Sequence, residues 1–479
     1  MKMQKVIKGE LMNIYRTIVL ACCLFSVAFS MEFNLPVMGS TKITGSVELE
    51  LAEIMSGRLT LSTRKIPVDH QWFSHFNGFL NFESKPMAIL LLRGGFEFRQ
   101  YMNMSARMAK TYYNVNAYFM GEQVYHDFFL REAQGIISFI DNESFSFDLS
   151  IGYMPYKYNP EVRELGEFLF RSGTYPFYLL GEFDRPFARL TGIKTGFTSV
   201  SDLLDIKADL FFLTEREIRP FWDFSLAGIA SVNIIKTFEI GCGVDFAHLF
   251  STNNALTTPD TTQTRYFSDS TVADDGFGNM ITTYDTAYYT FKGSKIMARA
   301  TIDPFGQFRG NGSVLSDIVG KEGGKLYGEV AIIGLKNYPA NDYNPYGYDN
   351  LKQKMPWMLG ITFPLWKILD VCALEFERYP NPYPNSAAWV IRSGWPIPYM
   401  ENRNAEEGYD TGKAYVPRWF WSLYMKKEVV KNFSILCQIG RDHMRWEMPI
   451  VYQTANYDYE DIMVKPKDWT WHIKTIFRF

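Results

Sequence analysis

Apolar and polar residues alternate one by one along residues 469–479, which read WTWHIKTIFRF. Successive side chains of a strand point to opposite faces, so this stretch predicts a β-strand with one mainly apolar and one mainly polar face. Aromatic rings stand at both ends of the apolar face. At about 3.3 Å per residue and a tilt near 45°, the stretch rises roughly 26 Å, close to the ~25 Å apolar band of a membrane-spanning β-barrel.

The same two-residue period returns in many segments of the chain. The clearest cases are residues 144–153, 204–212, 222–232, 238–246, 419–425 and 433–439. In the N-terminal third, strands are predicted at residues 43–54, 58–65, 71–82, 88–102 and 126–140. Alternation over about eight to eleven residues is long for a strand of a β-sandwich and typical of a tilted strand that spans a membrane.

The predicted strands total seventeen, but bacterial single-chain membrane barrels have an even number of strands. The sequence therefore predicts an all-β fold, a transmembrane antiparallel β-barrel of about 16 strands with a range of 14–18. Such barrels join their strands by short turns on one side of the membrane and by long loops on the other. Short links are predicted at residues 141–144, 199–202, 233–236, 364–367 and 430–432, with long links between them. The link at residues 303–324 breaks the rule, because it falls on the short-turn side and yet is long.

A terminal strand of alternating apolar residues that ends on phenylalanine resembles the C-terminal signal by which bacterial outer-membrane β-barrels are recognised for assembly. The residues that carry this resemblance are Trp469, Trp471, Ile473, Phe477 and Phe479. The chain thus resembles the outer-membrane β-barrel proteins of Gram-negative bacteria, at the level of the porin-like class. The resemblance implies that outer-membrane lipid and the barrel assembly machinery are partners. The alternative is the closing strand of a secreted β-sandwich that ends on phenylalanine by chance.

The start of the chain has the pattern of a secretory signal. Four basic residues precede an apolar run at residues 17–29, and Ala28-Phe29-Ser30 has the small-x-small pattern of a cleavage site. We therefore expect residues 1–30 to be a signal peptide and residues 31–479 to form the barrel. Met12 is an alternative start. A lipid-bearing Cys22 is the weaker alternative, because only a short apolar stretch separates it from Arg16.

Composition narrows the functions open to the exported chain. The full sequence is 47% hydrophobic and 16% aromatic with a formal net charge of −3, so there is no excess of basic residues that would indicate a nucleic-acid partner. No run of ~18 apolar residues follows the signal, which excludes helical membrane spans. Cys242, Cys372 and Cys437 are odd in number and far apart in sequence, and they fall on predicted apolar faces. A disulfide framework is therefore not expected.

The polar faces of the predicted strands carry many charged residues. A barrel of about sixteen strands is too wide for side chains to fill, so charges on its inner face need water. The candidate lumen-lining residues are Asp148, Asp205, Lys207, Asp209, Glu239, Asp245, Glu375, Glu377 and Lys474. The interior is therefore expected to be an aqueous channel. Both signs of charge occur, so the list predicts no preference between anions and cations.

The long link at residues 155–186 is the candidate constriction. Within it, NPEVRELGEFLFRSG predicts a capped helix, with Asn159 as N-cap, Pro160 in the first turn and Gly173 at the end. We expect the link to fold into the lumen and narrow it, as the third loop does in general porins. A charged helix on the outer surface is the alternative. The candidate constriction residues are Arg163, Glu164, Glu167, Arg171, Asp184 and Arg185.

Nothing in the sequence indicates an enzyme. The six histidines form no metal-binding pair such as HExxH, and no GxSxG motif occurs, so no catalytic residue, metal or cofactor is assigned. The predicted function is a porin-like channel for passive diffusion of small hydrophilic solutes, with a homotrimer expected by analogy with general porins. The alternatives are a structural or adhesive barrel whose surface loops bind other cells or fibres, and a fatty-acid-type transporter.

Overall fold

The structure is a computed structural model, and it describes most of the chain after the predicted signal. The described residues are 31–35, 39–61, 64–102, 125–171, 188–215, 222–250, 252, 266–274, 280–288, 292–308, 318–320, 322–335, 350–365, 368–380, 418–444, 463 and 465–479. The predicted signal peptide at residues 1–30 lies outside these ranges.

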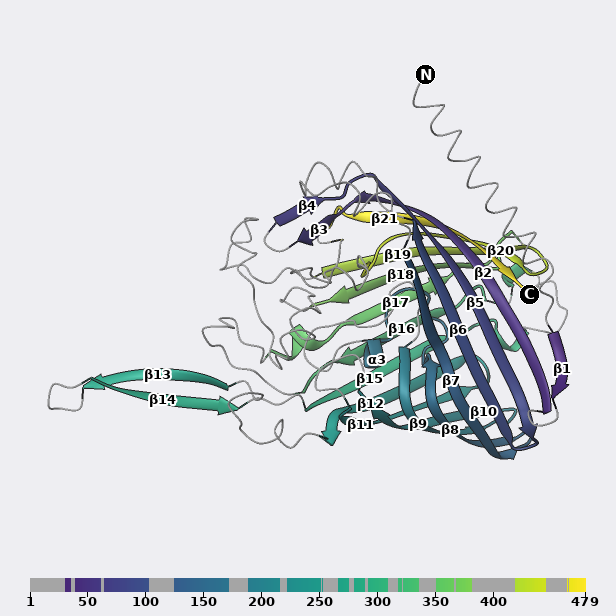
Figure 1. The fold of residues 1–479 in the computed structure, drawn as a ribbon, viewed down its shortest axis with the longest axis horizontal. Coiled ribbons are helices and arrows are strands. Elements are labelled where there is room, and N and C mark those ends of the chain that lie inside the picture. The colour runs from purple at the N-terminus through teal and green to yellow at the C-terminus, as the bar shows by residue number, and fades with distance from the viewer. Residues whose placement is uncertain are drawn as a thin grey trace, which may run out of the picture.

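The described elements are almost all β-strands (Figure 1). In chain order they are β1 (Met31–Leu35), β2 (Gly39–Ser56), β3 (Arg58–Leu61), β4 (Arg64–Pro67), β5 (Gln71–Met87), β6 (Leu90–Met102), β7 (Tyr125–Asp141), β8 (Phe145–Tyr156), β9 (Ala188–Ser199), β10 (Leu204–Thr214), β11 (Phe224–Ile234), β12 (Phe238–Phe250), β13 (Tyr266–Asp274), β14 (Met280–Tyr288), β15 (Gly293–Ile302), β16 (Leu326–Ile332), β17 (Trp357–Thr362), β18 (Val371–Tyr379), β19 (Arg418–Val430), β20 (Phe433–Arg441) and β21 (Trp469–Arg478). One short helix, α3 (Phe168–Arg171), lies between β8 and β9.

Sixteen of these strands close into a barrel. Each pairs antiparallel with the next in the order β2-β5-β6-β7-β8-β9-β10-β11-β12-β15-β16-β17-β18-β19-β20-β21, and β21 pairs with β2 to complete the ring. β1 pairs with β2 at residues 39–43, beyond the point where the β2–β21 ladder ends at Ser46. β1 therefore extends the junction between the first and last wall strands, β2 and β21, here called the seam, and is not an additional wall strand. The prediction of an all-β antiparallel barrel with sixteen strands is confirmed.

The structure also identifies the seventeenth segment of the sequence-based count. Residues 58–65 were predicted as one barrel strand, and this prediction is wrong. Residues 58–61 form β3 and residues 64–65 begin β4, and among the described strands these two pair with each other in a separate two-stranded sheet. Each of the two strands is four residues long, far shorter than a strand that crosses an apolar band of ~25 Å.

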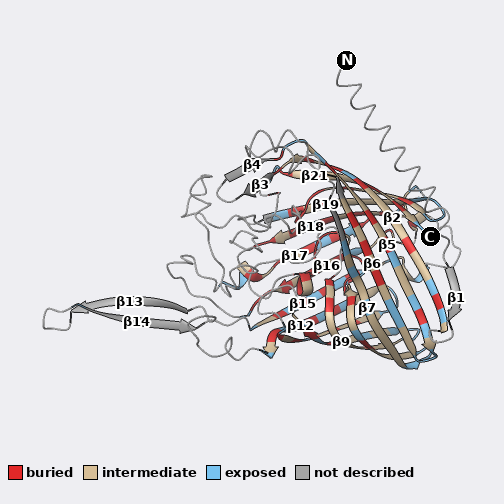
Figure 2. Cartoon of the chain, viewed as in Figure 1, coloured by how far each residue is buried: buried red, intermediate tan, exposed pale blue. Residues whose placement is uncertain are grey.

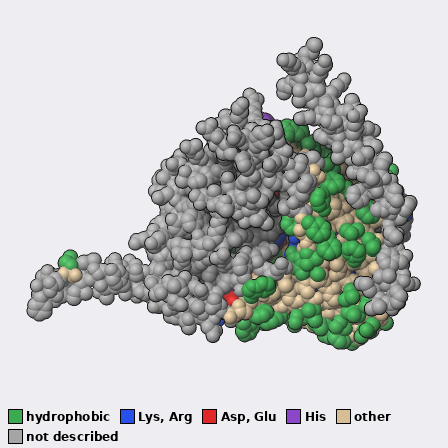
Figure 3. All heavy atoms as spheres, viewed as in Figure 1, with side chains coloured by type: hydrophobic (Ala, Val, Ile, Leu, Met, Phe, Trp, Pro, Cys, Tyr) green, Lys and Arg blue, Asp and Glu red, His purple; other side chains and the backbone are tan. Residues whose placement is uncertain are grey.

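Residues of different burial alternate along the wall strands (Figure 2), and the exposed positions are mainly apolar. On β12, for example, Ile240, Val244 and Phe246 are 48%, 38% and 41% exposed, whereas Asp245 is 5% exposed. Figure 3 shows hydrophobic side chains gathered on the outer wall of the barrel. Cys242 and the other two described cysteines are free, and Cys242 lies exposed on this face. Among the described residues, no helix is long and apolar enough to cross a membrane.

The lengths of the links follow the predicted alternation. β7 and β8, β9 and β10, β11 and β12, and β19 and β20 are joined by two to four residues. The links that follow β8, β12, β16, β18 and β20 are long, and the link after β12 carries the hairpin β13–β14. The exception predicted at residues 303–324 is present, since β15 ends at Ile302 and β16 begins at Leu326.

The C-terminal residue completes the seam of the barrel. The backbone N–H and C=O of Phe479 each form a 3.0 Å hydrogen bond with Gly45 of β2. A Cβ built on Gly45 would lie 2.4 Å from the Phe479 ring and 2.6 Å from the carbonyl oxygen of Phe79. Glycine is therefore needed at position 45, because the aromatic ring and the neighbouring strand occupy the space of any larger side chain.

Replacing Gly45 with alanine is expected to destabilise the barrel by about 1–3 kcal/mol, the usual cost of forcing extra atoms into a packed site. The midpoint of urea-induced unfolding in lipid vesicles measures the effect. Gly78→Ala is the matched control, because a Cβ on Gly78 of the adjacent strand would meet its nearest described atom at 4.0 Å, an ordinary contact. Equal losses of stability in the two variants would contradict this account of the seam.

Candidate functional site

Residues 157–171, here called the inward loop, leave β8 and pass through the inside of the barrel. Most of this segment is irregular, and only its last turn is helical, as α3. The predicted helix from Asn159 to Gly173 is therefore wrong over most of its length. Gly166 and Glu167 have φ values of +88° and +60°, which interrupt a right-handed helix. The backbone N–H groups before, at and just after this break are bonded to the barrel wall.

Three glutamates of the wall accept these bonds, and we call them the carboxylate cradle: Glu329 on β16, and Glu375 and Glu377 on β18. Glu375 accepts the backbone N–H groups of residues 163, 164 and 165 at 2.6, 2.9 and 3.0 Å. Glu377 accepts that of residue 166 at 3.0 Å, and Glu329 those of residues 167 and 168 at 3.2 and 2.8 Å. The cradle thus replaces intrahelical carbonyls as the acceptor for six consecutive N–H groups.

The apolar side chains of the inward loop pack against the inner wall. Val162, Leu165, Phe168 and Leu169 are each fully buried. Their wall partners in the same cluster come from seven or more strands and include Leu190, Phe211, Ile229, Met297, Tyr327, Met358 and Phe420. Part of the barrel interior is therefore an apolar core that fixes the loop, which the sequence-based expectation of a water-filled interior did not include.

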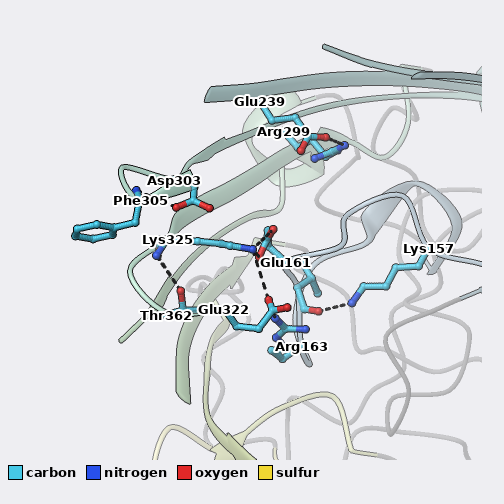
Figure 4. A network of polar contacts seen from close by, with 11 residues as sticks. Lys157, Glu161, Arg163, Glu239, Arg299, Asp303, Phe305, Glu322, Lys325 and Thr362 are labelled. Atoms are coloured by element: carbon cyan, nitrogen blue, oxygen red, sulfur yellow. Dashed lines mark hydrogen bonds and ion pairs between the residues drawn. The ribbon is translucent and has the colours of Figure 1, made fainter. Parts of the chain in front are cut away.

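A network of charged side chains holds the tip of the inward loop (Figure 4). Lys325, next to the start of β16, contacts both carboxylate oxygens of Glu161 at 2.8 and 3.0 Å. Arg163 Nη2 lies 3.0 Å from Glu322 Oε2, and Lys325 Nζ lies 3.5 Å from the same oxygen. Positive and negative groups therefore alternate along Glu161, Lys325, Glu322 and Arg163.

The structure places four of the six candidate constriction residues, and their role in narrowing a pore stays a prediction. Arg163 belongs to the network above. Arg171 is 1% exposed and its Nη1 donates to the carbonyl oxygens of Glu164 and Gly166 at 3.0 and 3.3 Å, so it folds the loop onto itself. Glu164 and Glu167 are also buried. Asp184 and Arg185 lie outside the described residues.

Burial raises the pKa of two of the three glutamates of the inward loop, Glu164 and Glu167. The pKa of Glu167 is raised to about 8, first by burial and then by the nearby carboxylate of Glu329. Both carboxylates bond the same pair of residues: Glu167 accepts the backbone N–H groups of Tyr158 and Asn159, while Glu329 accepts their side-chain hydroxyl and amide groups. Burial also raises the pKa of Glu164 well above its ordinary value, with further contributions from Asp442 and Glu375. The docked loop therefore favours neutral carboxyl groups.

The predicted lumen-lining residues lie on the inner face of their strands, and several form ion pairs. Lys194 on β9 lies 3.4 Å from Asp148 and 3.5 Å from Asp209. Other pairs join Glu239 to Arg299, Asp245 to Lys295, and Lys474 to Glu48 and Glu50. Asp205 and Lys207 share the Asp209 face of β10. Glu375 and Glu377 are 0% exposed, because the inward loop covers them. Whether the other residues line an open pore stays a prediction.

Sequence reasoning missed two structural features of this candidate site. The first is Glu329 on β16. Its position in the strand is that of an ordinary inward-facing polar residue, and no neighbouring residue in the sequence indicates that it binds the inward loop. His443, just after β20, contacts Glu377 at 2.5 Å and is 1% exposed, so it also supports the cradle. Within the described ranges, no group of three or more His, Cys, Asp or Glu side chains is arranged to hold a metal ion.

The comparisons with known proteins give likeness only in fold. No protein-family model and no curated protein matches the sequence. Among solved structures, the chain is similar to OmpF of Salmonella typhi in its complex with daunomycin, with 8% identity, a TM-score of 0.42 and coverage of 94% of this chain and all of that one. It is also similar to a triple mutant of the Rhodopseudomonas blastica porin, with 4% identity, a TM-score of 0.38 and coverage of 92% and 100%.

These likenesses are weak, and the strand pairings of this chain carry the assignment of its fold. Sixteen antiparallel strands close on themselves, short turns alternate with long links, and one long link enters the interior. The chain is therefore a closed, sixteen-stranded antiparallel β-barrel with part of one long link inside it.

Proposed function

We propose that this chain is an outer-membrane channel through which small hydrophilic solutes diffuse passively, and that the inward loop narrows its lumen. The observation that carries the proposal is a long link anchored inside a closed barrel by buried hydrogen bonds. Passive transport needs no catalytic residue and no cofactor, but it does need a constriction of fixed shape and charge. The cradle and the apolar core supply that rigidity.

The outer wall supports the location in a membrane. Large apolar side chains such as Leu210, Ile240 and Phe376 are 62%, 48% and 44% exposed, and they recur on alternate positions around the barrel. A soluble protein seldom exposes such a continuous apolar surface, whereas lipid tails cover it without cost. Outer-membrane lipid is then the principal partner, the barrel assembly machinery inserts the chain through its terminal strand, and a homotrimer is the expected assembly.

Conductance across a planar lipid bilayer tests the channel. The purified chain without residues 1–30 is expected to insert and to give discrete conductance steps that scale linearly with voltage. Entry of neutral sugars of increasing size into proteoliposomes measures the width of the constriction. Protein that inserts, as judged by flotation with vesicles, but gives no conductance would overturn the proposal and favour a structural or adhesive barrel.

A further inference from the structure

The unusual link at residues 303–324 has no role in the function proposed above. It joins β15 to β16 at the rim where the short turns lie, and its described parts are residues 303–308, 318–320 and 322–324. The inward loop enters the barrel from the opposite rim, after β8. The two segments nevertheless meet, because Arg163 of the loop contacts Glu322 of the link at 3.0 Å.

The link is firmly attached to the wall on its own side. Two apolar side chains at this rim are buried: Val319 of the link is 3% exposed, and Leu365 of the neighbouring link between β17 and β18 is 4% exposed. Thr362 at the end of β17 accepts the backbone N–H of Gly324 with its carbonyl oxygen and that of Lys325 with its hydroxyl, both at 2.9 Å. Lys325 and Glu322 are therefore carried by a fixed platform at the short-turn rim.

The four charged residues that join the loop to this platform differ from the cradle in their access to water. The side chains of Glu161, Lys325 and Arg163 are 10%, 12% and 17% exposed, and that of Glu322 is 38% exposed. The cradle glutamates Glu375 and Glu377 are 0% exposed. Dissolved ions screen partly exposed pairs much more strongly than buried ones. Salt should thus weaken the four-residue network more strongly than it weakens the cradle.

We propose that Glu161, Arg163, Glu322 and Lys325 form an ion clamp that ties the tip of the inward loop to the link at residues 303–324, and that release of the clamp gives the barrel a second, wider state. This inference rests on the proposed function for its effect on transport. The contact itself does not depend on transport. The long link at the short-turn rim exists, in this view, to carry the fixed half of the clamp.

Thiol labelling measures release of the loop without any reference to conductance. The probe site is Val162→Cys, because Val162 lies between Glu161 and Arg163 and is 0% exposed. Cys242, Cys372 and Cys437 are replaced by serine in the same chain so that they do not react. The barrel is reconstituted in vesicles and treated with a membrane-impermeant maleimide. The clamp is then broken by Glu322→Gln, which removes the charge and keeps the shape.

Glu322→Gln is expected to raise the labelling rate roughly three- to tenfold, and salt is expected to raise the rate of the parent chain in the same direction. Asp370→Asn is the matched control: Asp370 lies at the same rim, is 43% exposed and pairs with Lys427 away from the loop. An unchanged rate in Glu322→Gln, or an equal rise in Asp370→Asn, would overturn the clamp.

Single-channel recording gives a second readout in case Val162→Cys itself loosens the loop. In an otherwise unaltered chain, Glu322→Gln should spend several-fold more time in the larger of two conductance levels, and Asp370→Asn should match the parent. A silent parent barrel would refute the proposed channel but leave the labelling result interpretable. A conducting parent whose conductance levels and labelling are both insensitive to Glu322→Gln would refute the clamp alone.

Discussion

Glu375→Ala is expected to free the inward loop and to increase single-channel conductance. The substitution removes the acceptor of three backbone N–H groups, at 2.6 to 3.0 Å, and of the Tyr327 hydroxyl at 2.8 Å. A buried donor left without a partner costs about 1–3 kcal/mol, so the loss is on the order of several kcal/mol for the docked loop. The docked loop therefore becomes less stable relative to a released loop, and the released population rises.

Two further variants make this prediction specific. Glu375→Gln keeps one acceptor oxygen in place and is expected to show a smaller rise in conductance than Glu375→Ala. Glu48→Ala removes a charge from the inner face of β2, where its described partner is Lys474 at 3.9 Å, and leaves the loop untouched. If Glu375→Ala conducts at the level of the parent chain, or only as much as Glu48→Ala does, the cradle does not hold the constriction.

The wall of the barrel could be predicted from the sequence because its signal is local. Two neighbours on a strand already differ in environment, as Val244 on the outside and Asp245 on the inside of β12 show. Repetition of that contrast along the chain indicates the barrel, and the even-number rule of membrane barrels corrects the count to sixteen. The rule does not say which predicted segment is not a wall strand. Residues 58–65 could not be singled out, because two short strands show the same alternation as part of one long strand.

The path of the inward loop could not be predicted because its determinants are distant in sequence. Asn159, Pro160 and Glu161 have the local chemistry of a helix start. Glu375, however, is more than 200 residues away, and it offers the loop stronger charge-assisted acceptors than the carbonyls of a helical turn. The local pattern therefore indicated that this link is a candidate constriction with charges of both signs. It did not indicate which wall residues accept hydrogen bonds from its N–H groups.

The pairing of charges inside the barrel was only half visible from the sequence. Asp148 and Asp209 were identified from alternation alone, since each occupies a polar position on a regular strand. Their common partner Lys194 lies on β9, between the two strands that carry them. Recognising that arrangement requires the order and register of the strands. These depend on how all sixteen strands pair around the barrel and cannot be read from one segment.

Raising the pH from about 5 to about 9 is expected to loosen the inward loop. The ordinary pKa of a glutamate is 4.5, and that of Glu167 in the docked loop is about 8, so docking favours the neutral carboxyl group. The contribution of Glu167 to the stability of the docked loop is fully present below pH 4.5, declines as the pH rises above that value, and is lost as the pH passes about 8. Each unit of pKa difference corresponds to about 1.4 kcal/mol, so the effect on docking is on the order of a few kcal/mol. The raised pKa of Glu164 acts in the same direction.

Two measurements check this dependence. The first is maleimide labelling of Val162→Cys at pH 7 and 9, where an exposed cysteine serves as the reference for the pH dependence of thiol reactivity. The second is single-channel conductance at pH 5, 7 and 9. Glu167→Gln removes the charge and keeps one oxygen, which can accept the N–H of Asn159, now 2.5 Å from Oε1, while the weaker 3.4 Å bond from the N–H of Tyr158 to Oε2 is lost. This variant should hold the loop better than the parent at pH 9, and Glu164→Gln combined with it should nearly abolish the response to pH. Retention of the full pH response in the double variant would show that other groups control docking. Loosening at pH 5 and tightening at pH 9 would reverse the sign and refute the role of the two buried carboxyl groups.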